Sequence, residues 1–148
     1  SIYAALNFNG SIELDPVDSR DAPIIAALNA DQSTDKGFGP ALGPAAGMAA
    51  IQRLQALGYQ VVHGESDWIL GPDDQDIQTD IVNLCAAVAR QSSDLTVTEI
   101  SGWLAKRQGM IAARSSSIRI GHTDFFGLPT GTRSFDRLQS NNTSSPKG

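Results

Sequence analysis

The chain has 148 residues, of which 41% are hydrophobic and 18% charged, and its net charge at pH 7 is −5. This length suits one domain with a hydrophobic core rather than two. The negative charge disfavours a nucleic-acid-binding surface, because it repels phosphate backbones. No apolar run approaches the length of a membrane span, so we expect a cytoplasmic protein with no membrane partner. Cys85 is the only cysteine, which excludes an internal disulfide.

The first predicted element is a buried apolar strand over Ile2–Phe8. Asn9-Gly10 then predicts a tight turn, because both residue types tolerate positive φ, and Ser11–Leu14 predicts a strand that doubles back. Because the apolar strand follows Ser1 directly, without a methionine or a polar lead, we expect the chain to be a piece of a longer protein.

Two helices are predicted on either side of a glycine-rich loop. Asp21 is placed to cap the first, which should end near Asp31. The second should begin at Pro44 and end at the cap residue Gly58. Its apolar residues recur every three positions and predict a stripe that faces a core: Met48, Ile51, Leu54 and Leu57.

The second half of the chain predicts two short strands, two helices and a last strand. The short strands are expected at Tyr59–His63 and Asp67–Leu70, and the last strand at Ser117–Phe126. One helix follows Gly71–Asp74 and the next begins near Thr98. Their apolar residues should face the core, together with Trp68: Ile77, Ile81, Leu84, Cys85, Val88, Ile100, Trp103, Leu104 and Ile111. The polar residues 129–148 predict a disordered tail.

The glycines between Asp35 and Pro44 raise the possibility of a phosphate site, since the amino terminus of a helix attracts anions. The spacing Gly37-x-Gly39-x-x-x-Gly43 departs from the known nucleotide fingerprints, however, and a polar loop rather than a strand precedes it. Pro40 and Pro44 also lack amides that could bind phosphate. A turn-rich connection with glycines at positive φ is the favoured interpretation.

His63, His122 and Asp124 supply the ligand types of a non-haem iron site. In such sites the paired histidine and carboxylate normally precede the second histidine, whereas here the pair comes last. A lone histidine in a strand is more often a hydrogen-bonded structural residue. We therefore predict no metal site, and no catalytic Ser-His-Asp or paired-carboxylate arrangement stands out.

Three segments resemble the carboxy-terminal half of bacterial class I S-adenosylmethionine-dependent methyltransferases: DKGFGPALGP, GYQVVHGESDWILGPDD and SIRIGHTDFF. The resemblance covers about residues 1–128. It implies an α/β fold, part of a Rossmann-like sheet with flanking helices, in which IYAALNFNGSIELDP is the fifth of seven strands. The runs around Val61–Leu70 and Ile118–Phe125 would be the last two strands, one of them antiparallel.

The resemblance implies a protein that transfers a methyl group from S-adenosylmethionine to an acceptor, most simply a small molecule. The glycine loop that binds the methionine part of the cofactor and the acid that binds its ribose have no counterpart here, so we expect no cofactor-binding residue and an inactive isolated chain. The missing amino-terminal half of the domain would be its partner. Expected substrate-side residues are Asn7, Asp35, Lys36 and Phe38. Where the family has a basic or imidazole residue before the loop, this chain has Asp31-Gln32-Ser33-Thr34.

Two other classes of function remain open at this point. One is a non-catalytic binding or interaction module that uses the exposed Gly/Pro loop. The other is a nucleotide-binding enzyme that uses the segment Gly37–Gly43. The sequence encoded upstream of Ser1 would discriminate them, because an acidic-x-Gly-x-Gly strand and turn is the methyltransferase signature.

Overall fold

The computed structural model describes residues 1–130, so the predicted disordered tail lies, from residue 131 onward, outside the described residues. Within this range the chain forms four strands and four α-helices, which confirms the expected mixed α/β class. The strands are β1 (Ile2–Asp15), β2 (Tyr59–Glu65), β3 (Trp68–Leu70) and β4 (Ser117–Pro129). The helices are α1 (Asp21–Gln32), α2 (Ala46–Ala56), α3 (Gln75–Ser92) and α4 (Val97–Ala112), with a short 3-10 helix, η1 (Gly43–Ala45), before α2.

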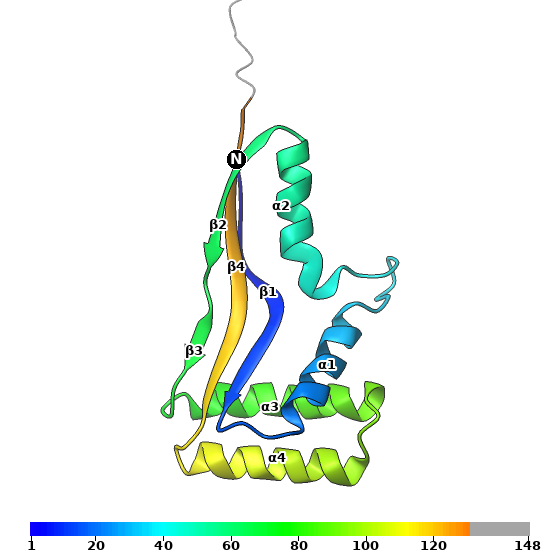
Figure 1. Ribbon diagram of the computed structural model, residues 1–148, viewed down its shortest axis with the longest axis vertical. Coiled ribbons are helices and arrows are strands. Elements are labelled where there is room, and N and C mark those ends of the chain that lie inside the picture. The colour runs from blue at the N-terminus through cyan, green and yellow to red at the C-terminus, as the bar shows by residue number, and fades with distance from the viewer. Residues whose placement is uncertain (131–148) are drawn as a thin grey trace, which may run out of the picture.

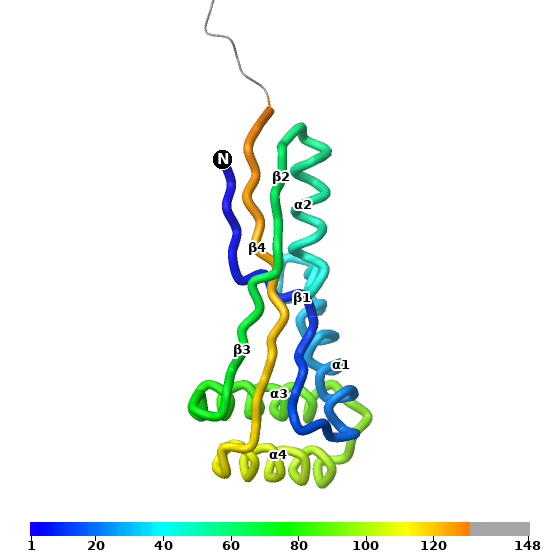
Figure 2. The backbone as a smooth tube through the Cα atoms, turned by 60° about the vertical axis from the view of Figure 1, so that its left-hand side comes forward, coloured from blue at the N-terminus to red at the C-terminus, as the bar shows by residue number. Residues whose placement is uncertain are grey.

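The four strands form one antiparallel sheet with β4 at its centre. β1 pairs with one edge of β4, while β2 and β3 pair in succession with the other edge (Figure 1, Figure 2). Tyr3 and Val62, for example, both lie opposite Phe126. Because β1 and β2 each run against β4, they run parallel to each other on its two sides.

Strand β1 corrects the hairpin predicted around Asn9-Gly10. The segments on both sides of this dipeptide pair with β4, so the chain bends there rather than reversing. Gly10 has φ 92°, and the Asn9 side chain accepts a hydrogen bond from the Ser11 amide at 3.0 Å. These features form an irregularity inside one long strand, as a bulge does. The predicted burial of the first half is also wrong, since this half is an edge of the sheet and Tyr3 is 67% exposed.

The two short strands predicted after Gly58 are confirmed, and the chain between them is held by β4. The Ser66 amide donates to the carbonyl oxygen of His122 at 3.0 Å. Asp67 then accepts from the His122 amide at 2.9 Å and from Nε of Arg119 at 2.7 Å. These contacts hold Ser66 and Asp67, which lie between β2 and β3, against β4. Both short strands therefore pair with the same edge of β4.

The main core lies between the lower part of the sheet and helices α1, α3 and α4 (Figure 1). Thr96 caps α4 through a reciprocal pair of bonds with Glu99, and α3 packs between α1 and α4. The predicted core positions of Trp103 and Cys85 are confirmed, whereas Trp68 is 38% exposed and that prediction is wrong. The core includes Leu14, Ile24, Leu28, Val82, Ala86, Ala89, Ile100, Ile111, Ile118 and Ile120.

Helix α2 packs on the upper part of the sheet, chiefly against β2. Its predicted stripe holds only in part, because Ile51 is buried while Met48 and Leu57 are exposed. An α-helix has 3.6 residues per turn, so residues spaced by three drift around it and leave the buried face.

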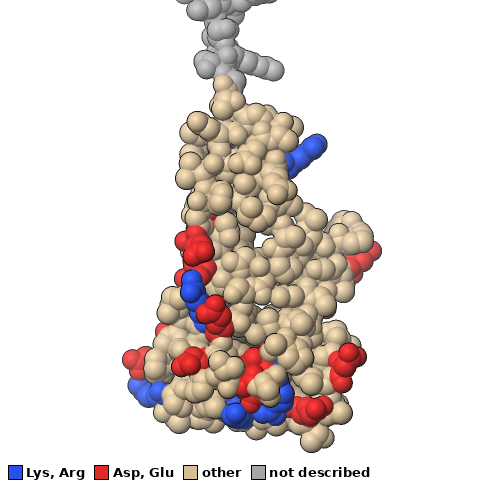
Figure 3. Space-filling model, in the orientation of Figure 1, with Lys and Arg blue, Asp and Glu red and all other residues tan. Residues whose placement is uncertain are grey.

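The surface seen in Figure 3 carries acidic and basic side chains side by side, most of them over the lower end with α3 and α4. No broad basic area appears on this face. Among residues 1–130, no helix combines the length and apolar character that a bilayer span requires.

Candidate functional site

The loop between α1 and η1 carries three of the four predicted substrate residues and projects from the body (Figure 1). Lys36 Nζ lies 3.1 Å from both carboxylate oxygens of Asp31, and Phe38 is fully exposed. Asn7 lies in β1, where its Nδ2 donates to the carbonyl oxygen of Thr123 at 2.8 Å. None of the four predicted residues lines the groove or the pocket described below.

The third loop residue, Asp35, occupies the amides that a phosphate would need. Its Oδ1 accepts from the Gly37 amide at 2.7 Å and from the Gly39 amide at 2.9 Å. Both glycines have positive φ, 108° and 93°, and their two N–H groups converge on one oxygen. An anion belonging to the loop itself therefore takes this position, which weakens the nucleotide-binding interpretation.

The histidines and the aspartate considered for a metal each have a separate environment. His63 is exposed in β2, opposite Phe125. Asp124 accepts hydrogen bonds from the Ser66 hydroxyl at 2.6 Å and from the Leu6 amide at 2.8 Å, and these bonds hold its pKa below the usual range. Over residues 1–130, no three His, Cys, Asp or Glu side chains are grouped to hold a metal ion.

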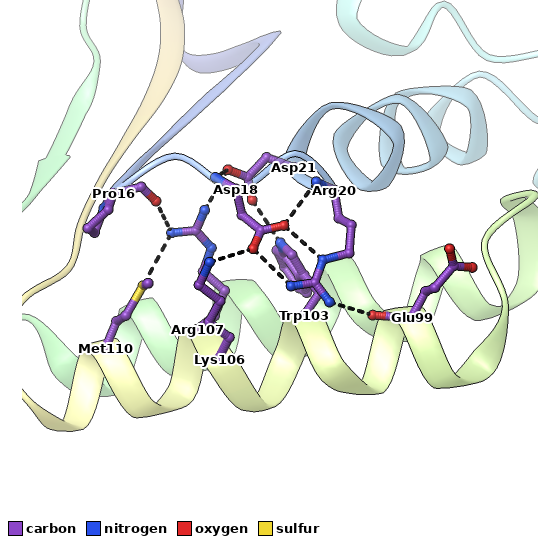
Figure 4. Close-up of polar contacts among 9 residues, drawn as sticks. All are labelled: Pro16, Asp18, Arg20, Asp21, Glu99, Trp103, Lys106, Arg107 and Met110. Carbon is purple, nitrogen blue, oxygen red and sulfur yellow. Dashed lines mark hydrogen bonds and ion pairs between the residues drawn. The ribbon is translucent and has the colours of Figure 1, made fainter.

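A buried polar cluster, which the sequence analysis missed, joins the start of α1 to α4 (Figure 4). Asp21 accepts from Nε1 of Trp103 at 2.7 Å, from the Asp18 amide at 2.7 Å and from Nη2 of Arg107. Arg107 is fully buried and also donates to the carbonyl oxygen of Pro16 at 2.7 Å. Asp21 is thus the first residue of α1 rather than its cap, a place that Arg20 holds.

The second carboxylate of the cluster, Asp18, binds two cations. Arg20 donates to it through Nε at 2.8 Å and Nη2 at 2.9 Å, and Lys106 through Nζ at 2.8 Å. These bonds hold the pKa of Asp18 far below its usual range. The sequence feature that could have indicated this cluster is the Lys106-Arg107 pair next to the apolar stripe of α4. The acidic partners of this pair, however, lie more than eighty positions earlier in the sequence.

The cluster is a structural feature rather than a catalytic one. Both carboxylates are consumed by donors of the protein, and the side chains fill the space between α1 and α4 (Figure 4). The cluster attaches the connection between β1 and α1 to α4. A buried, hydrogen-bonded ion pair suits this role because its geometry is specific.

A groove of about 770 Å³ runs beside the second half of β1. Residues 10–15 form one wall, and one flank of α1 forms another: Ala22, Ile25, Ala26 and Asn29. The outer edge of β1 has no strand partner within residues 1–130. The small side chains of Ala22 and Ala26 next to an unpaired strand edge leave room for further polypeptide.

A smaller pocket of about 170 Å³ lies between α1, α3 and the sheet, and we call it the His122 pocket. His122 is only 7% exposed and forms part of the pocket lining. The other lining side chains are apolar apart from Gln32, the last residue of α1, and the thiol of Cys85. Burial raises the pKa of that thiol to about 11, so it is protonated at neutral pH. Apart from His122, no acidic or basic side chain lines this pocket.

Comparison of the chain with protein-family models, curated proteins and solved structures found no match. These comparisons therefore assign no family and no activity. The groove beside β1 and the His122 pocket are two open features of the described residues that can receive another group, whereas the carboxylates of the Asp18–Arg107 cluster are already bound by donors of the protein.

Proposed function

We propose that the chain is the carboxy-terminal part of a class I S-adenosylmethionine-dependent methyltransferase whose acceptor is a small molecule. The sheet arrangement is the observation that carries the proposal. The resemblance implies a fifth strand followed by two last strands, one of them antiparallel. β1 and β2 run parallel to each other, with the final strand, β4, antiparallel between them. A partial Rossmann-like sheet accounts for this order.

The outer edge of β1 supports the same proposal. Natural edge strands often avoid pairing with another chain by carrying charged residues or prolines. Between Ile2 and Ile12, β1 has neither. The groove beside residues 10–15 adds room next to the edge. In the proposed enzyme, the preceding half of the domain would continue the sheet here and would be the partner of this chain.

The described residues do not fit S-adenosylmethionine. The cofactor needs a glycine turn after a strand and an acid for the ribose, and the one glycine-rich loop follows a helix instead. Two of its amides, those of Gly37 and Gly39, already donate to Asp35. We therefore assign no step of methyl transfer to residues of this chain and place the cofactor site in the other half of the proposed enzyme.

Substrate contacts are proposed for the loop and for the strand that precedes it. Lys36 and Phe38 are exposed at the loop, and Asp35 shapes its backbone. Asn7 is half-buried in the sheet and would act by holding β1 on β4. Methyl transfer depends mainly on alignment of the acceptor and exclusion of water. Loop residues would therefore contribute to the reaction by positioning the acceptor.

The test compares two proteins by calorimetry with S-adenosylmethionine. One is the present chain, and the other is the chain extended by the sequence encoded upstream of Ser1. We expect micromolar binding to the extended protein and no measurable binding to residues 1–148. An extended protein that does not bind the cofactor, or that lacks an acidic-x-Gly-x-Gly segment, would overturn the methyltransferase proposal. Binding by the present chain alone would overturn its assignment as the half without the cofactor site.

A further inference from the structure

The His122 ring is held in one orientation by β4 and its neighbours. Nδ1 lies 3.1 Å from the carbonyl oxygen of Ile120, which only accepts, so Nδ1 carries a proton. The ring lies between two aromatic side chains, with centroid distances of 5.2 Å to Trp68 and 6.3 Å to Phe8. The His122 amide is bonded to Asp67. Neither the backbone nor the ring is therefore free to turn away.

The other ring nitrogen, Nε2, is an unused hydrogen-bond acceptor. When Nδ1 carries the single proton of a neutral ring, Nε2 presents a lone pair. Within residues 1–130, the hydrogen bonds of His122 run through its amide and Nδ1, and none reaches Nε2. The carboxamide of Gln32 lines the same pocket. The acceptor of a nearly buried residue and a second polar group thus share an otherwise apolar pocket.

We infer that the His122 pocket binds a small, neutral, aromatic molecule that carries a hydroxyl group, and that the hydroxyl donates to Nε2 of His122. The walls are aliphatic and aromatic, including Leu28, Ile81 and Ile120, which favours an apolar ring. The absence of any lining charge disfavours an ionic ligand, which would lose its hydration without gaining a partner.

The volume of the pocket limits the ligand to one ring. The pocket measures about 170 Å³. An apolar cavity of about 150 Å³ holds benzene, whereas drug-sized ligands occupy roughly 300 Å³ or more. The pocket therefore covers one aromatic ring, and most of a nucleotide or an adenosyl group would lie outside it. The inference concerns this pocket alone and does not depend on methyl transfer.

The test measures binding of phenol and of toluene to the 148-residue chain by NMR. The two probes have the same ring and nearly the same size, but only phenol can donate a hydrogen bond. We expect both to shift the methyl resonances of Leu28 and Ile120, phenol to bind about tenfold more tightly, and the Nε2 resonance of His122 to move with phenol alone. Equal affinities, an unmoved Nε2 resonance, or no binding of either probe at millimolar concentration would overturn the inference.

Two variants separate the imidazole from the packing around it. His122→Phe retains a flat ring between Phe8 and Trp68 but removes Nε2, and it should abolish the preference for phenol. His63→Phe, on the exposed part of β2, is the matched control and should retain the preference. A His122→Phe variant that still prefers phenol would contradict the inference. Should this variant not fold, the Nε2 resonance of the unmodified chain still decides the question.

Discussion

Nε1 of Trp103 lies 2.7 Å from Oδ1 of Asp21, and both residues are buried although 82 positions separate them in the sequence. The bond links α4 to the first turn of α1. Arg107, one turn further along α4, donates to the other oxygen of the same carboxylate. One carboxylate thus links two helices from opposite halves of the chain, and its two side-chain partners can be removed one at a time.

Trp103→Phe removes the indole donor while it keeps an aromatic ring in the core. Asp21 then loses one of its buried partners, and such a loss costs about 1–3 kcal/mol in addition to the smaller volume of the ring. We expect a lower free energy of unfolding in urea, with an unchanged slope. Trp68→Phe is the control, because Trp68 is partly exposed and makes no hydrogen bond with residues 1–130 through its indole. Equal destabilisation by the two variants would contradict a specific role for the Trp103–Asp21 bond.

Arg107→Met leaves the Asp21 charge buried without its cation. Removing one partner of a buried ion pair costs about 3–5 kcal/mol, so this variant should be close to unfolding in a chain of this size. Asp21→Asn in the same protein removes the unpaired charge and still accepts from Trp103. We expect the double variant to be more stable than Arg107→Met alone, as measured in a double-mutant cycle. Additive losses would mean that the two side chains do not act as a pair.

Acid should destabilise the protein partly through Asp18. Arg20 first, and then Lys106, hold the pKa of Asp18 below its usual value in the folded chain. The folded chain then binds fewer protons at this group than the unfolded chain does. Its stabilising contribution is complete above the unfolded pKa, about 3.9, and is lost as the pH falls toward the lower folded value.

The measurement is the free energy of unfolding between neutral pH and pH 2 for the unmodified protein and for Asp18→Asn. The unmodified protein should lose stability below about pH 4 more steeply than the variant. Asp73→Asn serves as the control, because Asp73 pairs with Arg114 at the exposed surface, where ion pairs contribute little. Parallel pH profiles for the unmodified protein and Asp18→Asn would show that this carboxylate does not contribute.

Local sequence signals predicted most elements of the fold. Gly58, with φ 81°, ends α2 as expected of a glycine cap, and Thr96 with Glu99 forms the capping box of α4. The Asn9-Gly10 signal failed because a turn dipeptide specifies only a local bend. Whether the chain reverses there depends on which strand is available for pairing, and β4 lies more than a hundred positions later.

The candidate sites were harder to predict for the same reason. Both the Asp18–Arg107 cluster and the His122 pocket join residues that are remote in the sequence. His122 was correctly expected to be a hydrogen-bonded strand residue, yet its aromatic neighbours, Phe8 and Trp68, come from two other strands. The substrate roles of Asn7, Asp35, Lys36 and Phe38 remain predictions.

The thiol of Cys85 should be unreactive in the folded protein. It is 2% exposed, and burial raises its pKa to about 11, so almost no thiolate is present at pH 8. Modification by Ellman's reagent should therefore be slow and should accelerate in proportion to unfolding as urea is added. Rapid stoichiometric reaction without denaturant would contradict the buried position of this residue in α3.

The loop offers the last prediction, which separates a binding role from a structural one. Phe38 is fully exposed, so Phe38→Ala should change the melting temperature little, whereas loss of a buried phenyl costs about 3–5 kcal/mol. Lys36→Ala breaks only a surface ion pair with Asp31, worth about 0–1 kcal/mol. Leu42→Ala, another exposed position in the same loop, is the control.

The functional half of this test uses the extended protein and its methyl-transfer rate once an acceptor is known. If the loop positions the acceptor, Lys36→Ala and Phe38→Ala should reduce kcat/KM at an unchanged melting temperature, while Leu42→Ala should not. Wild-type rates in both variants would remove these residues from the proposed site. A lowered melting temperature for Phe38→Ala, with activity in proportion to the folded fraction, would instead show that this ring anchors the loop, and the exposed position of Phe38 would then require another part of the protein to cover it.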